Sequence, residues 1–359
     1  MNIRRWVLTP LVIALFIVAA VSSVPVAAQP QPPKVDKKVE KAQKFDTEAV
    51  IRATDLAATG QPANDFTMTW RSDAFKSAEG KIYLPFTISF PQSEAPAGKA
   101  VTMYIRAVGA APAATPAQPP AKGAKSARPE YAFEQRYFVD LASPASATEP
   151  YRISRPLLLT PGEFDVYVTL KERLPVDAKD REKKVTKTGV LKHTLTVPNL
   201  WSDKLATSTI ILADKMEPLA QPLAPEVQLE HPYTIGQLQI EPAKSNSFSK
   251  KAELSTFFMI YNTGMGADKK PDVTVEYGFY QKVAAAENGE KFFNKTNPQA
   301  FNAKTLPPQF DSSQGHQLIG GISVPLASFP EGEYRLEIKI TDKLSGTSLV
   351  QNVAFIVTA

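Results

Sequence analysis

Histidine is the residue type in this chain whose side chain most directly suggests acid–base or metal chemistry. It occurs three times, as His193, His231 and His316. A zinc site needs several ligands, and some of them usually recur at a short, fixed spacing in the sequence. No two of these histidines have such a spacing. We therefore expect structural or surface histidines, and we predict neither a metal site nor another cofactor.

The other side chains and motifs of catalysis are also missing from the sequence. Cysteine is absent, so the chain has no disulfide, thiolate metal site, cysteine nucleophile or site for lipoprotein acylation. It contains no Gly-x-Ser-x-Gly motif, no phosphate-binding loop and no dinucleotide fingerprint. We predict that the protein is not an enzyme. A carboxylate pair assembled across strands would not be visible in the sequence, so an enzyme stays an open alternative.

Residues 253–262 form the most unusual stretch, because the strand that they predict is apolar on both faces. One face carries Phe257, Met259 and Tyr261, and the other carries Phe258 and Ile260. A strand of a two-sheet sandwich needs only one apolar face. Contiguous exposed aromatic residues mark interaction surfaces, where tyrosine and methionine are common.

Tyr280 departs in a similar way on the next predicted strand, because it lies on the face opposite to the apolar residues of that strand. The predicted partner-binding surface consists of Phe257, Met259, Tyr261 and Tyr280. The alternative is that the segment 291–307, with its adjacent phenylalanines, covers these side chains from within the chain. In the first case the side chains are accessible to a partner, and in the second they belong to the core.

The strands that must position these residues are clearest at the C-terminus. Residues 334–341 alternate between apolar and polar side chains, beginning with Tyr334 on the apolar face. This period of two predicts a half-buried strand. Pro330 and Gly332 favour a turn before it, and a return strand over residues 350–357 completes a hairpin.

The same pattern occurs once more, earlier in the chain. A Gly-Glu pair precedes both Phe164 and Tyr334, and an alternating strand and a return strand follow each of them. Each copy must close its own core, so the repeat predicts two domains of one type. In immunoglobulin folds a tyrosine at this place bonds to nearby backbone, the tyrosine corner. We expect Tyr334 to form this bond, whereas Phe164 has no hydroxyl.

The composition favours an all-β fold. The chain has 31 prolines in 359 residues, and 43% of its residues are hydrophobic, an ordinary globular share. Proline is common in the turns that end strands and argues against long helices. We predict two immunoglobulin-like antiparallel β-sandwich domains in tandem, after a signal peptide and a flexible tether. The net charge of +5 is too small and too evenly spread to indicate nucleic-acid binding.

The N-terminal region predicts export. Residues 1–28 have the features of a signal peptide, with Arg4 and Arg5 before an apolar run and small residues at a cleavage site after Ala28. An uncleaved membrane anchor is the alternative. Residues 29–64 are rich in proline and lysine and predict a solvated tether, with a short helix over residues 47–58.

The two domains are predicted over the rest of the chain. The first covers residues 65–200, and the second covers residues 201–359. Residues 111–129 of the first domain are almost all Ala, Pro, Lys, Gly and Gln. Such a composition cannot bury apolar surface, so it predicts a disordered loop on a hairpin.

Residues 329–346 resemble the closing hairpin of immunoglobulin-like domains in uncharacterised secreted bacterial proteins. Residues 210–214 and 232–236 are similar to segments of the same loose group. Some members carry a Gly-Trp-x-Thr-Asp motif or a von Willebrand A-type module, and this sequence has neither, so neither activity carries over. The resemblance covers roughly residues 206–359 and, more faintly, 156–197. Its motifs are turns and strands, so it implies a fold and not a function.

These features together predict a non-catalytic exported envelope protein, periplasmic or extracellular, that acts as a binding or scaffold module. A sandwich without cysteine fits a bacterial envelope. The expected partner is a protein or an envelope polymer, with no membrane span after cleavage of the leader, and the oligomeric state is left open. The alternative is a periplasmic chaperone that holds a partner strand at a sheet edge. Its basic anchor would be Lys192, Arg155 or Lys204.

Overall fold

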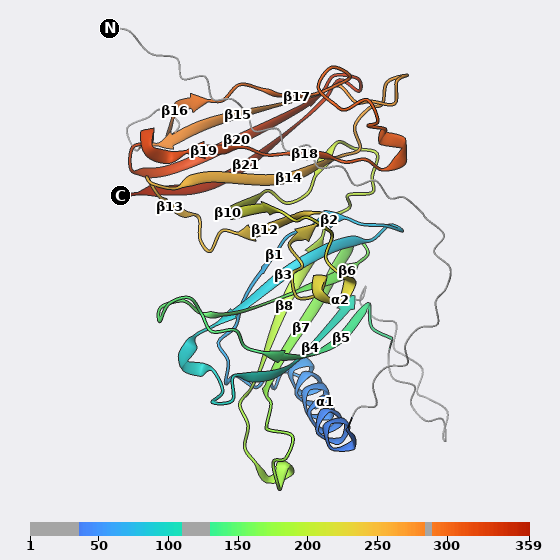
Figure 1. Ribbon diagram of the computed structural model, residues 1–359, viewed down its shortest axis with the longest axis vertical. Helices are drawn as coiled ribbons and strands as arrows, with labels where there is room; N and C mark the ends of the chain where they lie inside the picture. Colours follow the sequence, from blue (N-terminus) through green and yellow to red (C-terminus); the bar gives the residue numbers. More distant parts are fainter. Residues whose placement is uncertain (1–35, 110–129, 284–288) are drawn as a thin grey trace. The chain divides into compact units, whose positions relative to one another are not determined.

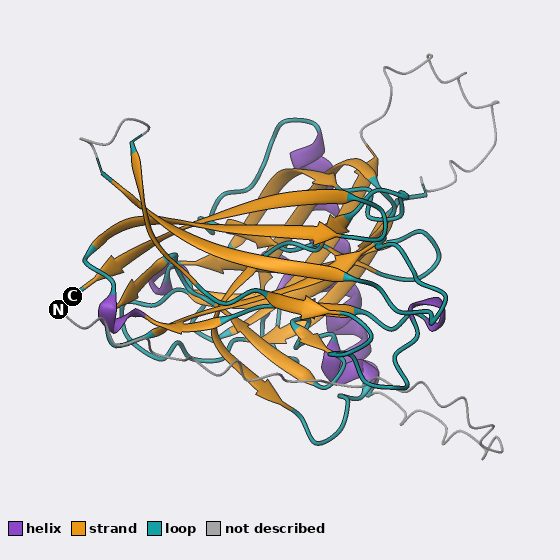
Figure 2. Cartoon of the chain, turned by 90° about the horizontal axis from the view of Figure 1, so that it is seen from above, coloured by secondary structure: helices purple, strands orange, loops and turns teal. Residues whose placement is uncertain are grey.

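Figure 1 shows the computed structural model of the chain, which describes residues 36–109, 130–283 and 289–359. Strands are the most abundant secondary structure of the described chain, and they form antiparallel sheets almost throughout (Figure 2), so the predicted all-β fold class is confirmed. The chain divides into two compact units at the Asn199–Leu200 bond. The expected signal peptide and the expected loop at 111–129 lie outside the described residues.

The first unit contains two four-stranded sheets. One sheet consists of β1 (Thr69–Ser72), β2 (Phe75–Lys76), β3 (Ile82–Phe90) and β6 (Tyr151–Leu159). The other runs in the order β5 (Phe133–Asp140), β4 (Ala100–Gly109), β7 (Gly162–Glu172) and β8 (Thr188–Val197). Alternate residues of the long strands, such as Phe86 on β3 and Met103 on β4, are fully buried. The period of two in the sequence therefore places one face of each sheet in the core.

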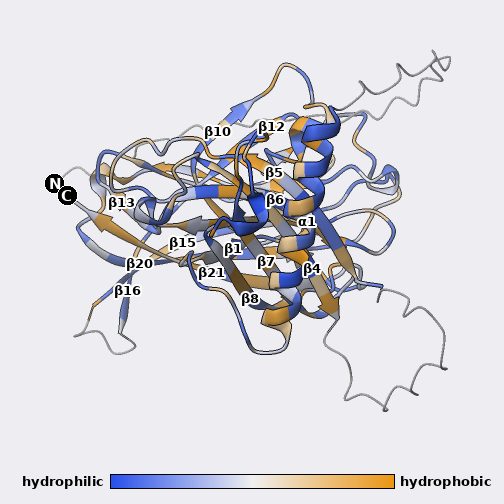
Figure 3. Cartoon of the chain, turned by 90° about the horizontal axis from the view of Figure 1, so that it is seen from below, coloured by the Kyte–Doolittle hydropathy of each residue, from blue (hydrophilic) through white to orange (hydrophobic). Residues whose placement is uncertain are grey.

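The N-terminal segment of this unit differs from the expected tether, because Lys37–Ala58 form the long helix α1. The carboxylate of Asp36 caps it by accepting a hydrogen bond from the backbone N–H of Lys38 at 2.8 Å. Figure 3 shows hydrophilic and hydrophobic residues mixed along α1, which packs on β4, β7 and β8. The predicted helix over residues 47–58 lies within α1, whereas the tether prediction for residues 37–46 was wrong because it was based on the lysines and not on the helical spacing of the residues between them.

The helices of the described chain are few. Beside α1 there are α2 (Pro225–Gln228) and the 3₁₀ turns η1 (Gln92–Glu94), η2 (Arg181–Lys183), η3 (Ser312–Gln314) and η4 (Leu326–Ser328). Among the described residues, none of the helices combines the length and the apolar character needed to cross a membrane.

The second unit contains a seven-stranded and a six-stranded sheet. The first consists of β9 (Ala206–Thr207), β10 (Ile211–Pro218), β11 (Thr234–Ile235), β12 (Leu238–Pro242), β14 (Glu253–Tyr261), β18 (Leu318–Gly320) and β19 (Ser323–Pro325). The second consists of β13 (Ser247–Ser249), β15 (Val273–Lys282), β16 (Glu290–Lys295), β17 (Gln299–Phe301), β20 (Gly332–Asp342) and β21 (Thr347–Thr358). One core cluster joins residues of both sheets, including Phe258 on β14 and Phe279 on β15. A departure from the antiparallel prediction is β13, which pairs with β21 in parallel.

The repeated hairpin is present in both units. In the first, β7 pairs with β8 from Gly162 opposite Val197, and in the second, β20 pairs with β21 from Gly332 opposite Val357. Both glycines have a positive φ, of 145° and 143°, which favours glycine at this turn. The hydroxyl of Tyr334 donates to the carbonyl oxygen of Pro330 at 2.8 Å. The expected tyrosine corner is therefore confirmed in the second unit.

Candidate functional site

Three of the four residues predicted to bind a partner are buried on β14. Phe257, Met259 and Tyr261 are exposed to only 2%, 5% and 4%. β14 is a central strand, with β9 and β10 along one side and β18 and β19 along the other. The hydroxyl of Tyr261 donates to the sulfur of Met259 at 3.3 Å. The expectation of an exposed aromatic surface on this strand is therefore wrong.

The segment that we expected as the cover of β14 lies in the other sheet. β16 and β17 pair with β15, which belongs to the six-stranded sheet. Phe293 packs against Phe329 and Tyr334, with ring centroids 4.8 and 5.7 Å apart. The phenylalanine next to it, Phe292, has the opposite orientation and is 52% exposed. The two adjacent phenylalanines thus divide between the core and the surface.

Tyr280, the fourth predicted residue, lies beside Phe292 on the outer face of the six-stranded sheet. The two rings meet edge to face, with centroids 5.7 Å apart. The guanidinium carbon of Arg335 lies 4.3 Å from the centroid of the Tyr280 ring, within the range of a cation–π contact. We call Tyr280, Phe292 and Arg335 the aromatic–arginine cluster, and it is our candidate functional site.

The backbone beneath Tyr280 is a glycine for a steric reason. A Cβ built on Gly278 would lie 3.2 Å from Cε2 of Tyr280, a close contact. The ring of Tyr280 therefore lies over Gly278, as aromatic residues often do over glycines in sheets. In the strand register Tyr280 is opposite Arg335 on β20 and Phe292 on β16, so these two residues flank it.

Three acceptors hold the guanidinium of Arg335 in place. Its Nε donates to Glu290 at 2.8 Å, and its Nη1 donates to Glu337 at 2.8 Å and to Asn352 at 2.6 Å. Partial burial acts to lower the pKa of Arg335, but the bonds to the two carboxylates outweigh it and raise the pKa. The cluster is therefore ordered in advance of any contact with a partner.

The position of the cluster beside β16 limits how a partner can bind. β16 pairs with β15 alone among the residues that the structure describes, and its register shifts between Phe279 and Tyr280 of β15. Lys291 and Lys295 are exposed on it. Bulges and lysines are the devices by which edge strands avoid pairing with another strand. We therefore expect a partner to contact the side chains of the cluster and not the backbone of β16.

The three histidines make local contacts elsewhere in the fold. His193 stacks on Trp70 with ring centroids 5.0 Å apart, and burial lowers its pKa. Nδ1 of His316 accepts the backbone N–H of Asp311 at 3.0 Å. The backbone N–H of His231 donates to Val227 within a turn. No group of three or more His, Cys, Asp or Glu side chains suited to a metal occurs within 36–109, 130–283 and 289–359.

The three basic residues considered as a chaperone anchor lie in different surroundings. Lys192 is half exposed and pairs with Asp165 at 2.8 Å. Arg155 is buried, with its guanidinium 4.9 Å from the centroid of the Tyr137 ring. Lys204 lines a shallow crevice of the second unit. The first two are already engaged by neighbours within the first unit.

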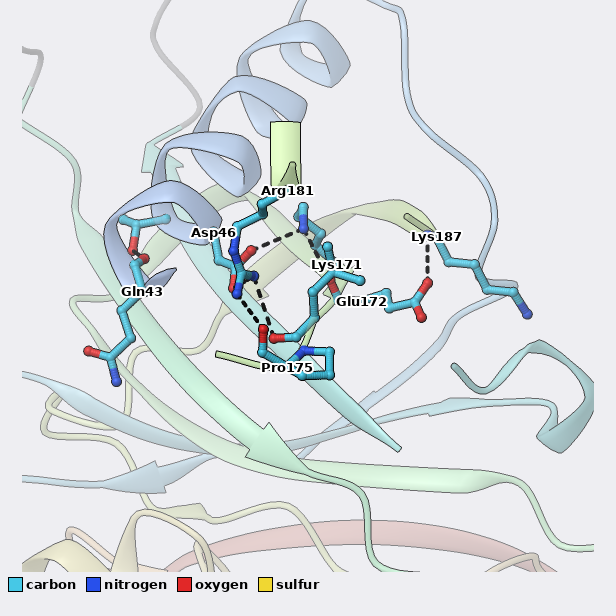
Figure 4. A network of polar contacts seen from close by, with 9 residues as sticks. Gln43, Asp46, Lys171, Glu172, Pro175, Arg181 and Lys187 are labelled. Carbon is cyan, nitrogen blue, oxygen red and sulfur yellow. Dashed lines mark hydrogen bonds and ion pairs between the residues drawn. The ribbon is translucent and has the colours of Figure 1, made fainter. Parts of the chain in front are cut away.

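A buried ionic network that the sequence reasoning missed joins α1 to the first unit (Figure 4). Asp46, which is 1% exposed, lies 3.1 Å from Nζ of Lys171 on β7 and 3.6 Å from Nη1 of Arg181. Nζ of Lys171 also donates to the carbonyl of Glu172, and Nη2 of Arg181 donates to the carbonyl of Pro175 at 2.6 Å. The signal in the sequence was the spacing of four between the buried residues of α1, which are Ala42, Asp46, Val50 and Thr54.

Comparisons with known proteins give no family for this chain. No family model matches it, and no curated protein matches it. The solved structures that it resembles include α-2-macroglobulin of Escherichia coli activated by porcine elastase, with 11% identity over 81% of this chain and 22% of that one, at a TM-score of 0.22. The native conformation of E. coli α-2-macroglobulin gives 13% identity over 81% and 16%, at 0.19. This chain thus spans less than a quarter of either, and at these TM-scores neither likeness bears on its function.

Proposed function

We propose that this protein is a non-catalytic, exported binding module of the bacterial envelope, and that it holds a protein partner on the aromatic–arginine cluster of its second unit. The proposal combines the leader sequence, the resemblance to secreted immunoglobulin-like proteins and the composition of the cluster. It places the protein in the periplasm or outside the cell. The leader is removed after Ala28 in this proposal.

The observation that carries the proposal is the exposure of Phe292 beside two side chains that are held in place. Phe292 is 52% exposed, its ring meets that of Tyr280 edge to face, and Arg335 lies over the Tyr280 ring. Aromatic residues and arginine are enriched at protein interfaces and among the residues that dominate binding energy. A fixed cluster loses little side-chain entropy on binding, so more of the contact energy becomes affinity.

The chemistry of the cluster favours a protein with an apolar side chain at its contact point. The free face of Phe292 offers apolar area, and Glu290 and Glu337 give the rim around Arg335 a negative charge. Such a centre with a polar rim is the usual anatomy of a protein interface. An envelope polysaccharide is the competing partner, since sugars also stack on aromatic rings, and the experiment below includes it.

The test compares two variants in a binding assay with envelope extract. The double variant Tyr280→Ser, Phe292→Ser removes the cluster, and Val350→Ser removes an apolar side chain that is 47% exposed on β21 of the same sheet. We expect the double variant to lose at least tenfold in affinity for the captured protein, which is about 1.4 kcal/mol and typical of one interface anchor. Val350→Ser should bind as the unchanged protein does.

The same assay distinguishes a protein partner at the cluster from a polysaccharide partner and from a site elsewhere. Both variants should unfold at nearly the unchanged urea concentration, because the altered side chains lie outside the core cluster. If the double variant captures the same proteins with equal affinity, the cluster is not the site. If capture is abolished by digestion of the extract with glycosidases and not by proteases, the partner is a polysaccharide and the protein-binding proposal is wrong.

A further inference from the structure

The sheet face beneath α1 has a polar composition, like that of a solvent-exposed sheet face. Where β4 pairs with β7, the outward residues face each other in three pairs, Thr102 with Lys171, Tyr104 with Thr169, and Arg106 with Tyr167. All six side chains carry hydrogen-bonding groups. An antiparallel sheet with one solvated side has this alternation of polar and apolar residues. The face can therefore be uncovered without placing a large apolar surface in water.

Two ionic contacts join α1 to this face, one near the middle of the helix and one near its C-terminal end. Near its middle, Asp46 is paired with Lys171 and Arg181. Nine residues later, Asp55 accepts from Nη1 of Arg106 at 2.7 Å, and Arg106 is 4% exposed. Two carboxylates of the helix thus meet buried cations of the sheet.

A hydroxyl pair lies between these two ionic contacts. Oγ1 of Thr54 lies 2.6 Å from Oγ1 of Thr169 on β7, and neither residue is accessible to solvent. Only Ala42 and Val50 are apolar among the four fully buried residues of α1. The matching charges and hydrogen bonds therefore fix one position of the helix along the sheet.

The connection between α1 and the first strand is short and bends sharply. Gly60 has a φ of 88°, a conformation that favours glycine. The chain is then fixed to β8, because Val190 donates to the carbonyl of Ala63 at 2.9 Å and Asp65 donates to the carbonyl of Thr188 at 3.0 Å. The backbone N–H groups of Thr59, Gly60 and Gln61 donate to carbonyls of the last turn of α1, so the hinge is confined to the link between Gln61 and Ala63. Short hinges beside a detachable element favour its exchange between two copies of a chain.

We propose that the outer face of β4 and β7 is a helix-binding site, and that it accepts α1 from a second copy of this chain as well as its own. The site recognises a helix that carries carboxylates nine residues apart with a hydroxyl between them. The helix α1 of a second copy matches this site, since it carries the same groups at the same spacing. The exchange links two molecules without a new interface.

The test uses the absence of natural cysteine in the sequence. One copy carries Thr54→Cys and another carries Thr169→Cys, and the two are mixed at high concentration under mild oxidation. The two positions are buried against each other, so their sulfurs meet only when α1 of one copy docks on the sheet of the other. We expect a disulfide-linked mixed dimer on a non-reducing gel. Each variant alone should form no such dimer.

Two controls decide how the result is read. Adding Asp46→Asn to the Thr54→Cys copy should lower the yield of mixed dimer several-fold, because its helix competes less well for the site. Glu48→Gln, on the exposed side of α1, should leave the yield unchanged. A chain with both cysteines should form the disulfide within one molecule. If it does so while the mixture gives no mixed dimer, the proposal is overturned.

A second measurement does not depend on disulfide geometry. A fluorescent peptide of residues 36–59 is titrated with the full chain and its anisotropy is measured. We expect saturable binding, and at least tenfold weaker binding of the peptide with both Asp46→Asn and Asp55→Asn. No binding of the unchanged peptide, or equal binding of the two peptides, would contradict the proposal. The face would then hold only the helix of its own chain.

Discussion

The hydroxyl of Tyr334 shows what a single atom contributes at the turn before β20. It donates to the carbonyl oxygen of Pro330, and the residue is completely buried. Phe164 has the equivalent place in the first unit and lacks the hydroxyl. The same hairpin therefore forms with and without this bond, and the bond adds stability without being needed to define the fold.

We predict that Tyr334→Phe lowers the free energy of unfolding of the second unit by about 1 kcal/mol, the usual net value of one hydrogen bond. The ring contacts in the core are kept, so the loss is confined to the bond. Urea unfolding followed by far-UV circular dichroism measures it. Tyr280→Phe, on the outer face, serves as the control and should cost less than half as much. A loss above about 3 kcal/mol would show that the hydroxyl also supports the core.

A second residue-scale prediction concerns the carboxylate of Asp311, at the start of η3. Ser313 donates to it through its hydroxyl at 2.5 Å and its backbone N–H at 2.8 Å, and Lys269 lies 3.2 Å away. These bonds, above all that of the Ser313 hydroxyl, lower the pKa of Asp311 to about 2 from an ordinary 3.8. A pKa that is lower in the folded than in the unfolded chain stabilises the fold fully above pH 3.8, and the gain is lost as the pH falls to 2.

Ser313→Ala should therefore raise the pKa of Asp311 toward its ordinary value and make stability less dependent on pH between 4 and 2. Titration of the side-chain carboxyl carbon by NMR measures the pKa directly. Ser312→Ala, one residue before, is the control and should leave the titration in place. An unchanged pKa in Ser313→Ala would mean that the hydroxyl does not determine the ionisation of Asp311.

At the scale of elements, the docking of α1 depends on a buried ion pair and can be disturbed without unfolding the sheet. Loss of one partner of a buried pair usually costs about 3–5 kcal/mol, because a charge is left without its partner in a poorly solvated place. Here the helix can detach, and Lys171 and Arg181 then regain water. The loss of stability is thus limited to the free energy with which α1 docks on the sheet.

Asp46→Asn is accordingly predicted to release α1 and to leave the two sheets of the first unit intact. Hydrogen exchange followed by mass spectrometry should show at least tenfold faster exchange across Lys37–Ala58, with unchanged rates in β3 and β7. Glu48→Gln, on the exposed side of the helix, should change neither. Faster exchange throughout the first unit would show instead that α1 is an integral part of its core.

The strands could be predicted from the sequence to a large extent because each has a clear period. The alternation that begins at Tyr334 is the alternation of β20, and the Gly-Glu pair before Phe164 marks the start of β7. Such patterns depend only on which side of a strand faces the core. The outer residues of β4 are polar, and they belong to the face on which α1 lies.

The contacts between elements could not be predicted in the same way. Phe257 and Met259 alternate as surface residues of a sandwich strand would, and nothing local shows that they are buried. The bond between Asp46 and Lys171 joins residues 125 positions apart, which no short pattern reveals. The helical spacing in α1 was present in the sequence, but its lysines made that segment resemble a solvated tether.

For the molecule as a whole, the burial of β14 leaves one small candidate site, the aromatic–arginine cluster. It lies on the face of the second unit that carries Tyr280. Phe292 is exposed there, although Phe293 beside it packs against the core cluster. Adjacent residues of a strand point to opposite faces, so Phe293 enters the core and Phe292 stays outside, and the register of β15 with β16 shifts at this point. The edge is thereby protected from strand pairing and still presents an aromatic ring.

The most direct measurement of this central claim places a photo-reactive phenylalanine at position 292, and separately at position 350, in the full chain. Each protein is irradiated in envelope extract, and the products are separated by size and identified by mass spectrometry. The account predicts one dominant protein adduct from position 292 and none of it from position 350, although both side chains are about half exposed. Equal and unspecific labelling from the two positions would contradict it.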